Sequence, residues 1–179
     1  DFSYMAWIKS DEYQNGMGII SKYIGSGNQR SYDMVVPDVG HASATSIGID
    51  MSKDGAFSKG TTAIEVIAED VLEKGTWQNI AAVFESEKSV TVYVDGKVAT
   101  TEEQKIIKDV YENPAVPLYI GVDFDLAVAK RYFVGTIDEV VMYDKALTQN
   151  ELLKIMEGDL RAVEPKEKLA MLWGKLKMR

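Results

Sequence analysis

Apolar and polar residues alternate along most of the chain, in short segments separated by glycine, proline, aspartate and asparagine. A period of two predicts β-strands, because successive side chains of a strand point to opposite faces of the sheet. Short strands with frequent turns predict an all-β fold, a two-sheet antiparallel β-sandwich of the jelly-roll type. The expected strands cover residues 2–9, 18–24, 32–36, 46–51, 62–68, 77–85, 89–101, 117–122 and 132–143, with a hairpin turn at Asp95-Gly96.

One segment late in the chain, residues 148–157, has the pattern of a helix. Thr148 is a suitable N-cap, and Glu151 three residues later completes the sequence pattern of a capping box. Leu147 and Leu152 are spaced to pack against each other as a hydrophobic staple. We expect this helix to dock on the sandwich after the last strand.

Two segments fall outside these patterns. For residues 102–112 the sequence predicts either a helical turn or a loop. Residues 159–179, which follow a first domain of residues 1–158, form a basic tail with leucines and Trp173 at helical spacing. Such a segment can bind a membrane surface or a partner, or it can pack its tryptophan on the domain as a short helix.

Composition narrows the class of protein. The 179 residues are 46% hydrophobic and 27% charged, which fits a globular domain. The net charge is −8, with +3 in residues 159–179 and −11 in the rest, so an acidic body disfavours nucleic acid. No apolar run approaches the roughly 18 residues of a membrane span. The absence of cysteine excludes disulfides, thiolate metal sites and cysteine nucleophiles.

Five segments in order carry a resemblance to a known family: "YMAWIK", "GIISKY", "WQNIAAVFESEKSVTVYVDGKVA", "PLYIGV" and "FVGTIDEVVMYDKALTQNEL". Together they resemble a LamG-like jelly-roll domain of the concanavalin A-like lectin/glucanase superfamily, over residues 1–158. The resemblance implies a non-catalytic recognition module of an exported or cell-surface, bacterial-type protein. Its partner would be a carbohydrate or an extracellular protein.

The beginning of the chain departs from the family pattern. Relatives usually carry a strand or two before the "YMAWIK" position, whereas this chain opens directly in that strand, without a signal peptide. A missing strand would leave an unpaired sheet edge, which favours pairing with another chain. An alternative function is therefore that of a structural spacer or assembly module, self-associating through an edge strand or the tail.

Two adjacent acids, Asp138 and Glu139, stand in the middle of the last strand. Regular alternation would point them to opposite faces, so they could not act as an acid/base pair on one substrate. The Glu-x-Asp-x-x-Glu strand of laminarinase-type relatives is also absent. A glycoside hydrolase is therefore the least favoured function, and we expect no enzyme activity.

The resemblance implies a structural Ca²⁺ with Asp138 among its ligands, since Ca²⁺ takes six to eight oxygens in flexible geometry. The alternative is that Asp138 accepts backbone hydrogen bonds at the sheet edge. Asp123 and Asp125 form a second acidic cluster, which could bind Ca²⁺ at a loop rim or be solvated. The single histidine, His41, is expected in a loop.

Carbohydrate binding calls for aromatic faces and planar polar groups on loops or on a concave sheet. Trp7 and Trp77 are instead expected in the core. The candidate sugar-binding residues are Tyr13, Asn15, Asn28, Arg30, Tyr32 and Tyr132.

Overall fold

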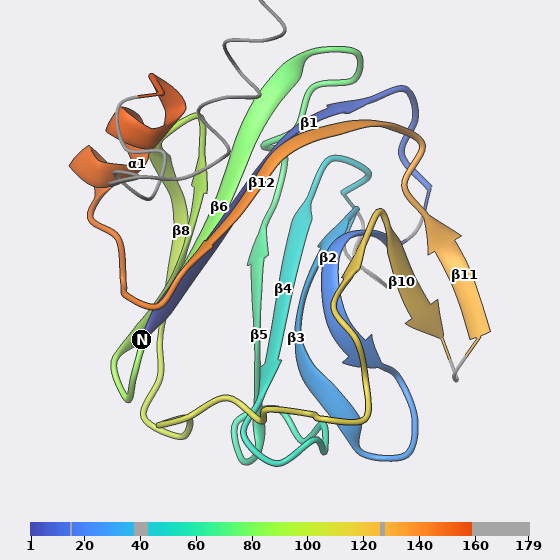
Figure 1. The fold of residues 1–179 in the computed structure, drawn as a ribbon, viewed down its shortest axis with the longest axis vertical. Helices are drawn as coiled ribbons and strands as arrows, with labels where there is room; N and C mark the ends of the chain where they lie inside the picture. Colours follow the sequence, from blue (N-terminus) through green and yellow to red (C-terminus); the bar gives the residue numbers. More distant parts are fainter. Residues whose placement is uncertain (15, 38–42, 126–127, 159–179) are drawn as a thin grey trace, which may run out of the picture.

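The computed structural model describes residues 1–14, 16–37, 43–125 and 128–158. Within these residues the chain forms twelve strands and one helix (Figure 1). In chain order they are β1 Phe2–Ser10, β2 Met17–Ile24, β3 Gln29–Val36, β4 Ile47–Ser52, β5 Ala63–Ala68, β6 Trp77–Glu85, β7 Ser89–Val94, β8 Lys97–Glu103, β9 Tyr119–Ile120, β10 Val122–Asp125, β11 Val128–Tyr132, β12 Gly135–Tyr143 and α1 Gln149–Met156.

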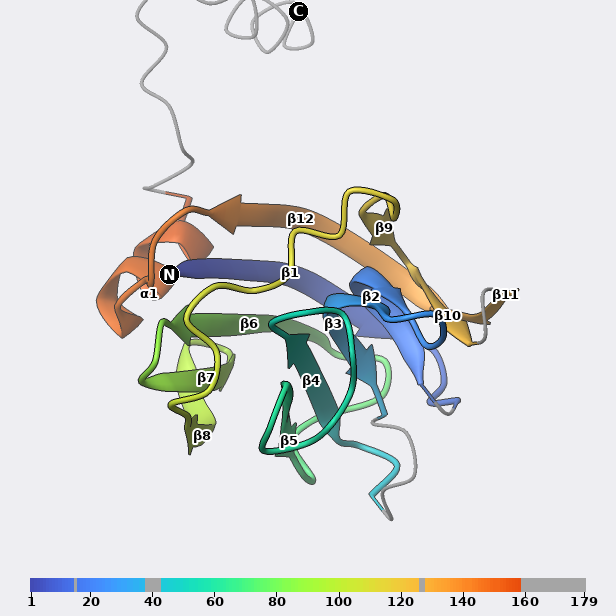
Figure 2. The ribbon, with the colours of Figure 1, turned by 90° about the horizontal axis from the view of Figure 1, so that it is seen from below.

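Two five-stranded antiparallel sheets form a sandwich, which confirms the predicted fold class. Sheet A has the strand order β12-β1-β6-β7-β8, and sheet B has the order β5-β4-β3-β2-β9. Figure 2 shows the strands of sheet A side by side in this order. The hairpin β10-β11 packs beside β2, outside the two sheets.

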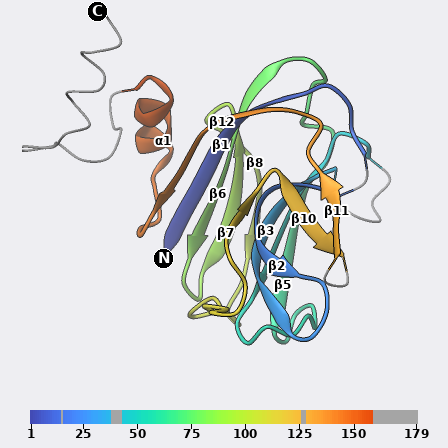
Figure 3. The same cartoon turned by 45° about the vertical axis from the view of Figure 1, so that its right-hand side comes forward.

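The main core lies between the sheets, and it takes one face of every long strand. Fully buried members come from both layers, among them Tyr4, Ile19, Met34, Ile49, Ile80 and Phe84. A second, smaller core lies on the other face of sheet A, where Met5, Ala81 and Val83 pack against Leu147, Leu152 and Ile155. Both faces of β1 are therefore covered, and Figure 3 shows α1 on the side of β1 and β12 that faces away from sheet B.

Helix α1 begins and ends as its sequence predicts. The Thr148 hydroxyl accepts a hydrogen bond from the Glu151 backbone N–H at 3.3 Å, and the Glu151 carboxylate accepts one from the Thr148 N–H at 2.8 Å. This reciprocal capping box satisfies two N–H groups that have no partner within the helix. Gly158 follows with a φ of 87°, and its N–H donates to the Ile155 carbonyl at 2.9 Å.

Residues 104–112 form a loop that crosses from sheet A toward sheet B, which is one of the two predicted alternatives. Residues 117–122, which were predicted as one strand, are divided between β9 and β10. Trp7 and Trp77 were expected in the core, but both lie on the outer face of sheet A. Trp7 is only partly buried, and 42% of Trp77 is exposed.

Strand β12 is irregular at Glu139. Met5 of β1 pairs with Val141, and Trp7 pairs with Asp138, so β12 has one residue more than β1 between these pairs. Glu139 has a φ of 48°, in the left-handed region that non-glycine residues seldom adopt. This β-bulge interrupts the alternation of side chains along the strand.

Candidate functional site

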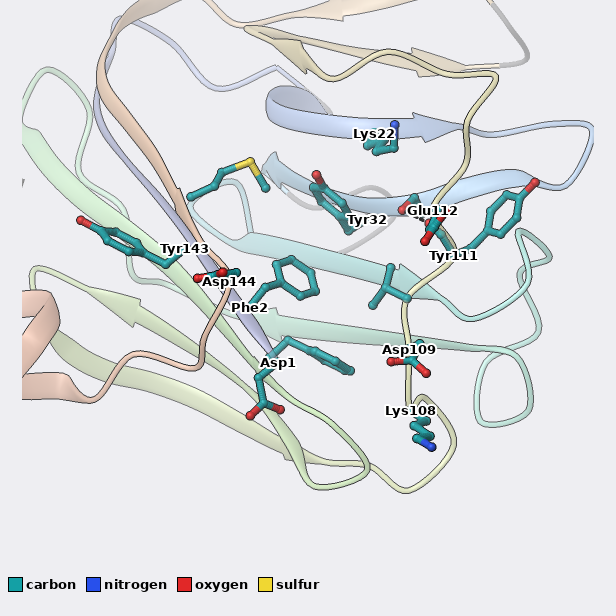
Figure 4. Close-up of a pocket in the computed structure, with 14 residues that line it drawn as sticks. Asp1, Phe2, Lys22, Tyr32, Lys108, Asp109, Tyr111, Glu112, Tyr143 and Asp144 are labelled. Carbon is teal, nitrogen blue, oxygen red and sulfur yellow. Dashed lines mark hydrogen bonds between the residues drawn. The ribbon is translucent and has the colours of Figure 1, made fainter. Parts of the chain in front are cut away.

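A cleft of about 600 Å³ opens where the two sheets diverge near the N-terminal residue, and we call it the end cleft. Strands of both sheets and the crossing loop line it (Figure 4). The aromatic residues that line it are Phe2, Tyr32, Phe84, Tyr111 and Tyr143, and the charged ones are Asp1, Lys22, Lys108, Asp109, Glu112 and Asp144. The Tyr143 ring itself packs against the second core, on the outer face of sheet A. The size lies within the range of small-ligand sites.

The floor of the end cleft is a cluster of aromatic rings. The ring centroid of Phe2 lies 5.3 Å from that of Tyr32 and 5.4 Å from that of Phe84. Burial raises the pKa of the Tyr32 hydroxyl above its ordinary value, which favours the neutral form that this hydroxyl already has at neutral pH. The floor thus presents apolar ring surface with a neutral hydroxyl.

The rim of the end cleft carries both signs of charge. In Figure 4, Asp1, Tyr143 and Asp144 stand on one side, and Lys22, Tyr111 and Glu112 stand on the other. Lys22 is fixed by a 2.7 Å hydrogen bond from its Nζ to the Val116 carbonyl.

The crossing loop, which supplies one side of the rim, is tied to the sandwich. The Ser31 hydroxyl donates to the Tyr111 carbonyl, and the Tyr111 N–H donates to the Ser52 carbonyl at 2.8 Å. An apolar floor beneath a fixed polar rim can stack the C–H face of a sugar and hydrogen-bond its hydroxyls.

A second hollow, of about 230 Å³, lies on sheet B beside the β10-β11 hairpin. Arg30 and Arg131 both line it. The Cζ of Arg30 lies 5.8 Å from the Tyr23 ring centroid and 5.9 Å from that of Phe57. Arg30 also donates a hydrogen bond to the Gly25 carbonyl. These contacts hold Arg30 as part of the wall.

The structure separates the sugar-binding residues that the sequence suggested. Tyr32 lines the end cleft and Arg30 lines the hollow on sheet B. Tyr13 packs against the main core, and Asn28 is an exposed turn residue with a φ of 53°. Tyr132 on β11 is 60% exposed. Asn15, like His41, lies outside the described residues, and the five described candidates do not share one hollow.

Tyr111 and Tyr143 were not among the sequence candidates, although both line the end cleft. Tyr111 lies in a segment without a period, and Tyr143 ends a strand whose pattern is that of packing. The sequence holds no local signal that brings these two residues together with Phe2.

Asp123, a candidate calcium ligand, is 1% exposed and already has partners. One oxygen accepts from the Ser21 hydroxyl at 2.8 Å, and the other accepts from Arg131 at 3.2 Å. Burial raises the pKa of the Asp123 carboxyl, while Ser21, the Phe124 N–H and Arg131 oppose this shift. The guanidinium group beside the carboxylate fits an ion pair rather than a Ca²⁺ ligand. The Asp125 side chain lies outside the description.

Asp138 and Glu139 line one and the same hollow on the outer face of sheet A. The expectation that they point to opposite faces is wrong, because the bulge at Glu139 breaks the alternation. Asp138 is exposed, and its Oδ1 accepts from the Glu139 N–H at 2.8 Å.

Calcium at Asp138 stays a prediction. Over residues 1–158, the masked positions excepted, no group of three or more His, Cys, Asp or Glu side chains is placed to hold a metal ion. Ca²⁺ at Asp138 would therefore take most of its oxygens from backbone carbonyls and water.

A family model described as the concanavalin A-like lectin/glucanases superfamily, Laminin_G_3, matches residues 1–153. The chain therefore belongs to this family. A stretch of 76 residues is 30% identical to the human adhesion G-protein coupled receptor D1 and covers 42% of this chain and 8% of the receptor. The chain thus corresponds to a small part of that relative.

Solved structures with the same fold include carbohydrate-binding domains. The sialidase CBM40 from Ruminococcus gnavus, bound to α2,3-sialyllactose, superposes with a TM-score of 0.68 at 15% identity, over 86% of this chain and 81% of that one. Domain 4 of AbnA, a GH43 extracellular arabinanase from Geobacillus stearothermophilus, was solved in complex with arabinotriose. It superposes with a TM-score of 0.59 at 17% identity, over 86% of this chain and 65% of that one. At these identities the likeness concerns the fold. No helix among the described residues is long and apolar enough to cross a membrane.

Proposed function

We propose that this chain is a non-catalytic carbohydrate-binding module of an exported or surface protein, and that its glycan lies in the end cleft. The observation that carries the proposal is the aromatic floor of Phe2, Tyr32 and Phe84 beneath a rim of charged side chains. Family membership and the sugar complexes of structural neighbours support the class of ligand.

The end cleft offers both kinds of contact that a sugar needs, stacking on aromatic rings and hydrogen bonds to its hydroxyl groups. The rings of Phe2 and Tyr32 at the floor offer a surface on which the apolar face of a pyranose or furanose can stack (Figure 4). Carboxylates such as Asp109 accept hydrogen bonds from hydroxyl groups, and Lys108 donates to ring and hydroxyl oxygens. The mixture of charges suits a polyhydroxylated ligand better than an apolar one.

A glycan array probed with the full chain, with and without Ca²⁺, tests this function. Binding to a defined set of glycans is expected, and Tyr32→Ala should weaken it about tenfold, as for loss of a stacking contact of roughly 1.4 kcal/mol. Tyr132→Ala is the matched control, because Tyr132 is exposed outside the cleft. Silence of the array under both conditions would remove carbohydrate as the ligand.

A second candidate is an assembly module, favoured by the position of β12 at the edge of sheet A. The strand is nine residues long, and an edge strand can pair with a strand of another chain. Sedimentation of the full chain over a range of concentrations tests this function. A monomer throughout would count against it.

A further inference from the structure

The outer face of sheet A holds a groove that the carbohydrate proposal does not use. Two adjoining hollows of about 290 and 370 Å³ share Trp7 and Glu139 as walls, and together we call them the tryptophan groove. Helix α1 supplies Ile155 and Met156 to its walls.

Strand pairing places three side chains of the groove in one row. Trp7 of β1 pairs directly with Asp138 of β12 on one side and with Asn79 of β6 on the other. Directly paired residues project to the same face of a sheet. Trp77 lies two residues before Asn79 on β6, so its largely exposed indole belongs to the same face.

The charge of the groove is entirely negative over the described part of the chain. Asp138, Glu139 and Glu157 line it, and none of its described lining residues is Lys, Arg or His. Indole faces attract cations through their negative ring surface, and carboxylates attract them by charge. The groove therefore favours a ligand with positively charged groups.

Asn79 adds a second requirement for the ligand, which is a hydrogen-bond acceptor. It is only 2% exposed, and its Nδ2 amide has no hydrogen-bond partner among the described residues. Its backbone is held by a pair of 2.8 Å hydrogen bonds with Asp95, so the side chain stays at the floor of the groove. A buried donor without a partner is costly, and a peptide carbonyl is a suitable acceptor.

A basic peptide with apolar side chains satisfies all of these features, since Met5, Val141 and Ile155 form the apolar part of the walls. Residues 159–179 have this chemistry, with a net charge of +3 and several leucines beside Trp173. They follow directly on Gly158, which itself lines the groove. A segment tethered at the edge of its site has a high effective concentration there.

We infer that the tryptophan groove is the binding site for the chain's own C-terminal segment, residues 159–179. The basic side chains of the segment lie over the indoles and carboxylates, and one of its carbonyls accepts from Asn79. This inference does not depend on the glycan proposal, because the end cleft and the groove share only Tyr143.

The absence of cysteine allows a direct test in the full chain. A single Ala170→Cys substitution takes a nitroxide spin label, and the indole N–H signals of Trp7 and Trp77 are recorded by NMR. We expect both signals to lose most of their intensity, and to recover when the label is reduced. Asp138→Asn combined with Glu139→Gln should restore much of the intensity in the labelled chain.

Two comparisons make the test decisive. Glu102→Gln combined with Glu103→Gln removes the same charge from the exposed strand β8 and should leave the signals weak. A mixture of two samples separates binding within one chain from binding between chains. One sample carries the isotope label without a spin label, and the other carries the spin label without isotope. Indole signals that are unaffected by the label, or weakened only in the mixture, would overturn the inference.

Discussion

The hydroxyl of Ser21 donates a 2.8 Å hydrogen bond to the carboxylate of Asp123, and both residues are fully buried. Ser21 belongs to β2 and Asp123 to β10, so this bond fixes the β10-β11 hairpin to sheet B. Arg131 of β11 contacts the same carboxylate at 3.2 Å. The position of the hairpin therefore depends on a polar group of three side chains as well as on apolar packing.

Removing the hydroxyl of Ser21 tests this dependence. Ser21→Ala should lower the free energy of unfolding by about 1–3 kcal/mol, as expected for a hydrogen bond to a buried charged group. Denaturant unfolding of Ser21→Ala, Asp123→Asn and the double variant gives the coupling between the two residues. Additive effects of the two substitutions would show that the bond is energetically unimportant.

The capping box of α1 should make stability depend on acid pH. Hydrogen bonds from Lys145, at 2.5 Å, and from Thr148 hold the pKa of Glu151 down at about 2, from an ordinary value of 4.5. The charged carboxylate therefore contributes stability above pH 4.5, and this contribution is lost as the pH falls from 4.5 toward 2.

Substitution of Glu151 by Gln keeps the hydrogen-bonding shape of the box but removes the charge. In thermal melts between pH 2 and 4.5, Glu151→Gln should lose less stability on acidification than the unsubstituted chain. Glu102→Gln, on the exposed strand β8, is the control and should follow the unsubstituted chain. Equal acid sensitivity of both variants would contradict the prediction.

Gly18 is required for the close approach of β2 to β10. A Cβ atom at this position would lie 2.3 Å from the Val122 carbonyl carbon, a backbone atom that cannot move independently. Gly18→Ala should therefore destabilise the fold by about 1–3 kcal/mol, the usual range for overpacking. Gly60→Ala, where a Cβ meets open space at a φ of 79°, measures the backbone strain alone and should cost less.

The calcium hypothesis at Asp138 has a simple thermal test. If Ca²⁺ binds there, the melting temperature rises with added CaCl₂ and falls back with EDTA, because a ligand bound to the native state stabilises it. Asp138→Asn should abolish the shift, and Asp123→Asn should leave it unchanged, since Asp123 is paired with Arg131. No shift for the unsubstituted chain would remove the hypothesis.

The features that the sequence predicts well are those decided locally. The alternation of strands, the turn at Gly96 and the capping box of Thr148 each depend on residues a few positions apart. Trp77 and Glu139 were predicted wrongly because their environments depend on neighbouring strands. The bulge can be recognised only when the pairing of β12 with β1 is known, and the exposure of Trp77 only when the face of sheet A on which it lies is known.

The end cleft could not be assembled from the sequence for the same reason. Phe2 and Tyr111 line one cleft because the crossing loop runs past the mouth between the sheets. The crossing loop has no regular alternation of apolar and polar residues, so its sequence does not indicate which strands it will lie beside. The class of ligand could be anticipated from the family resemblance, whereas its location needed the three-dimensional arrangement.

The pairing of β1 with both β6 and β12 has a consequence for biosynthesis. Among the strands of this domain β1 is synthesised first, and its two neighbours are completed only at residues 85 and 143. During translation, one side of β1 therefore stays unpaired until nearly the whole sandwich has left the ribosome. Contacts of such long sequence separation slow folding, so nascent chains of this domain should depend on chaperones more than chains of a helical protein of equal length.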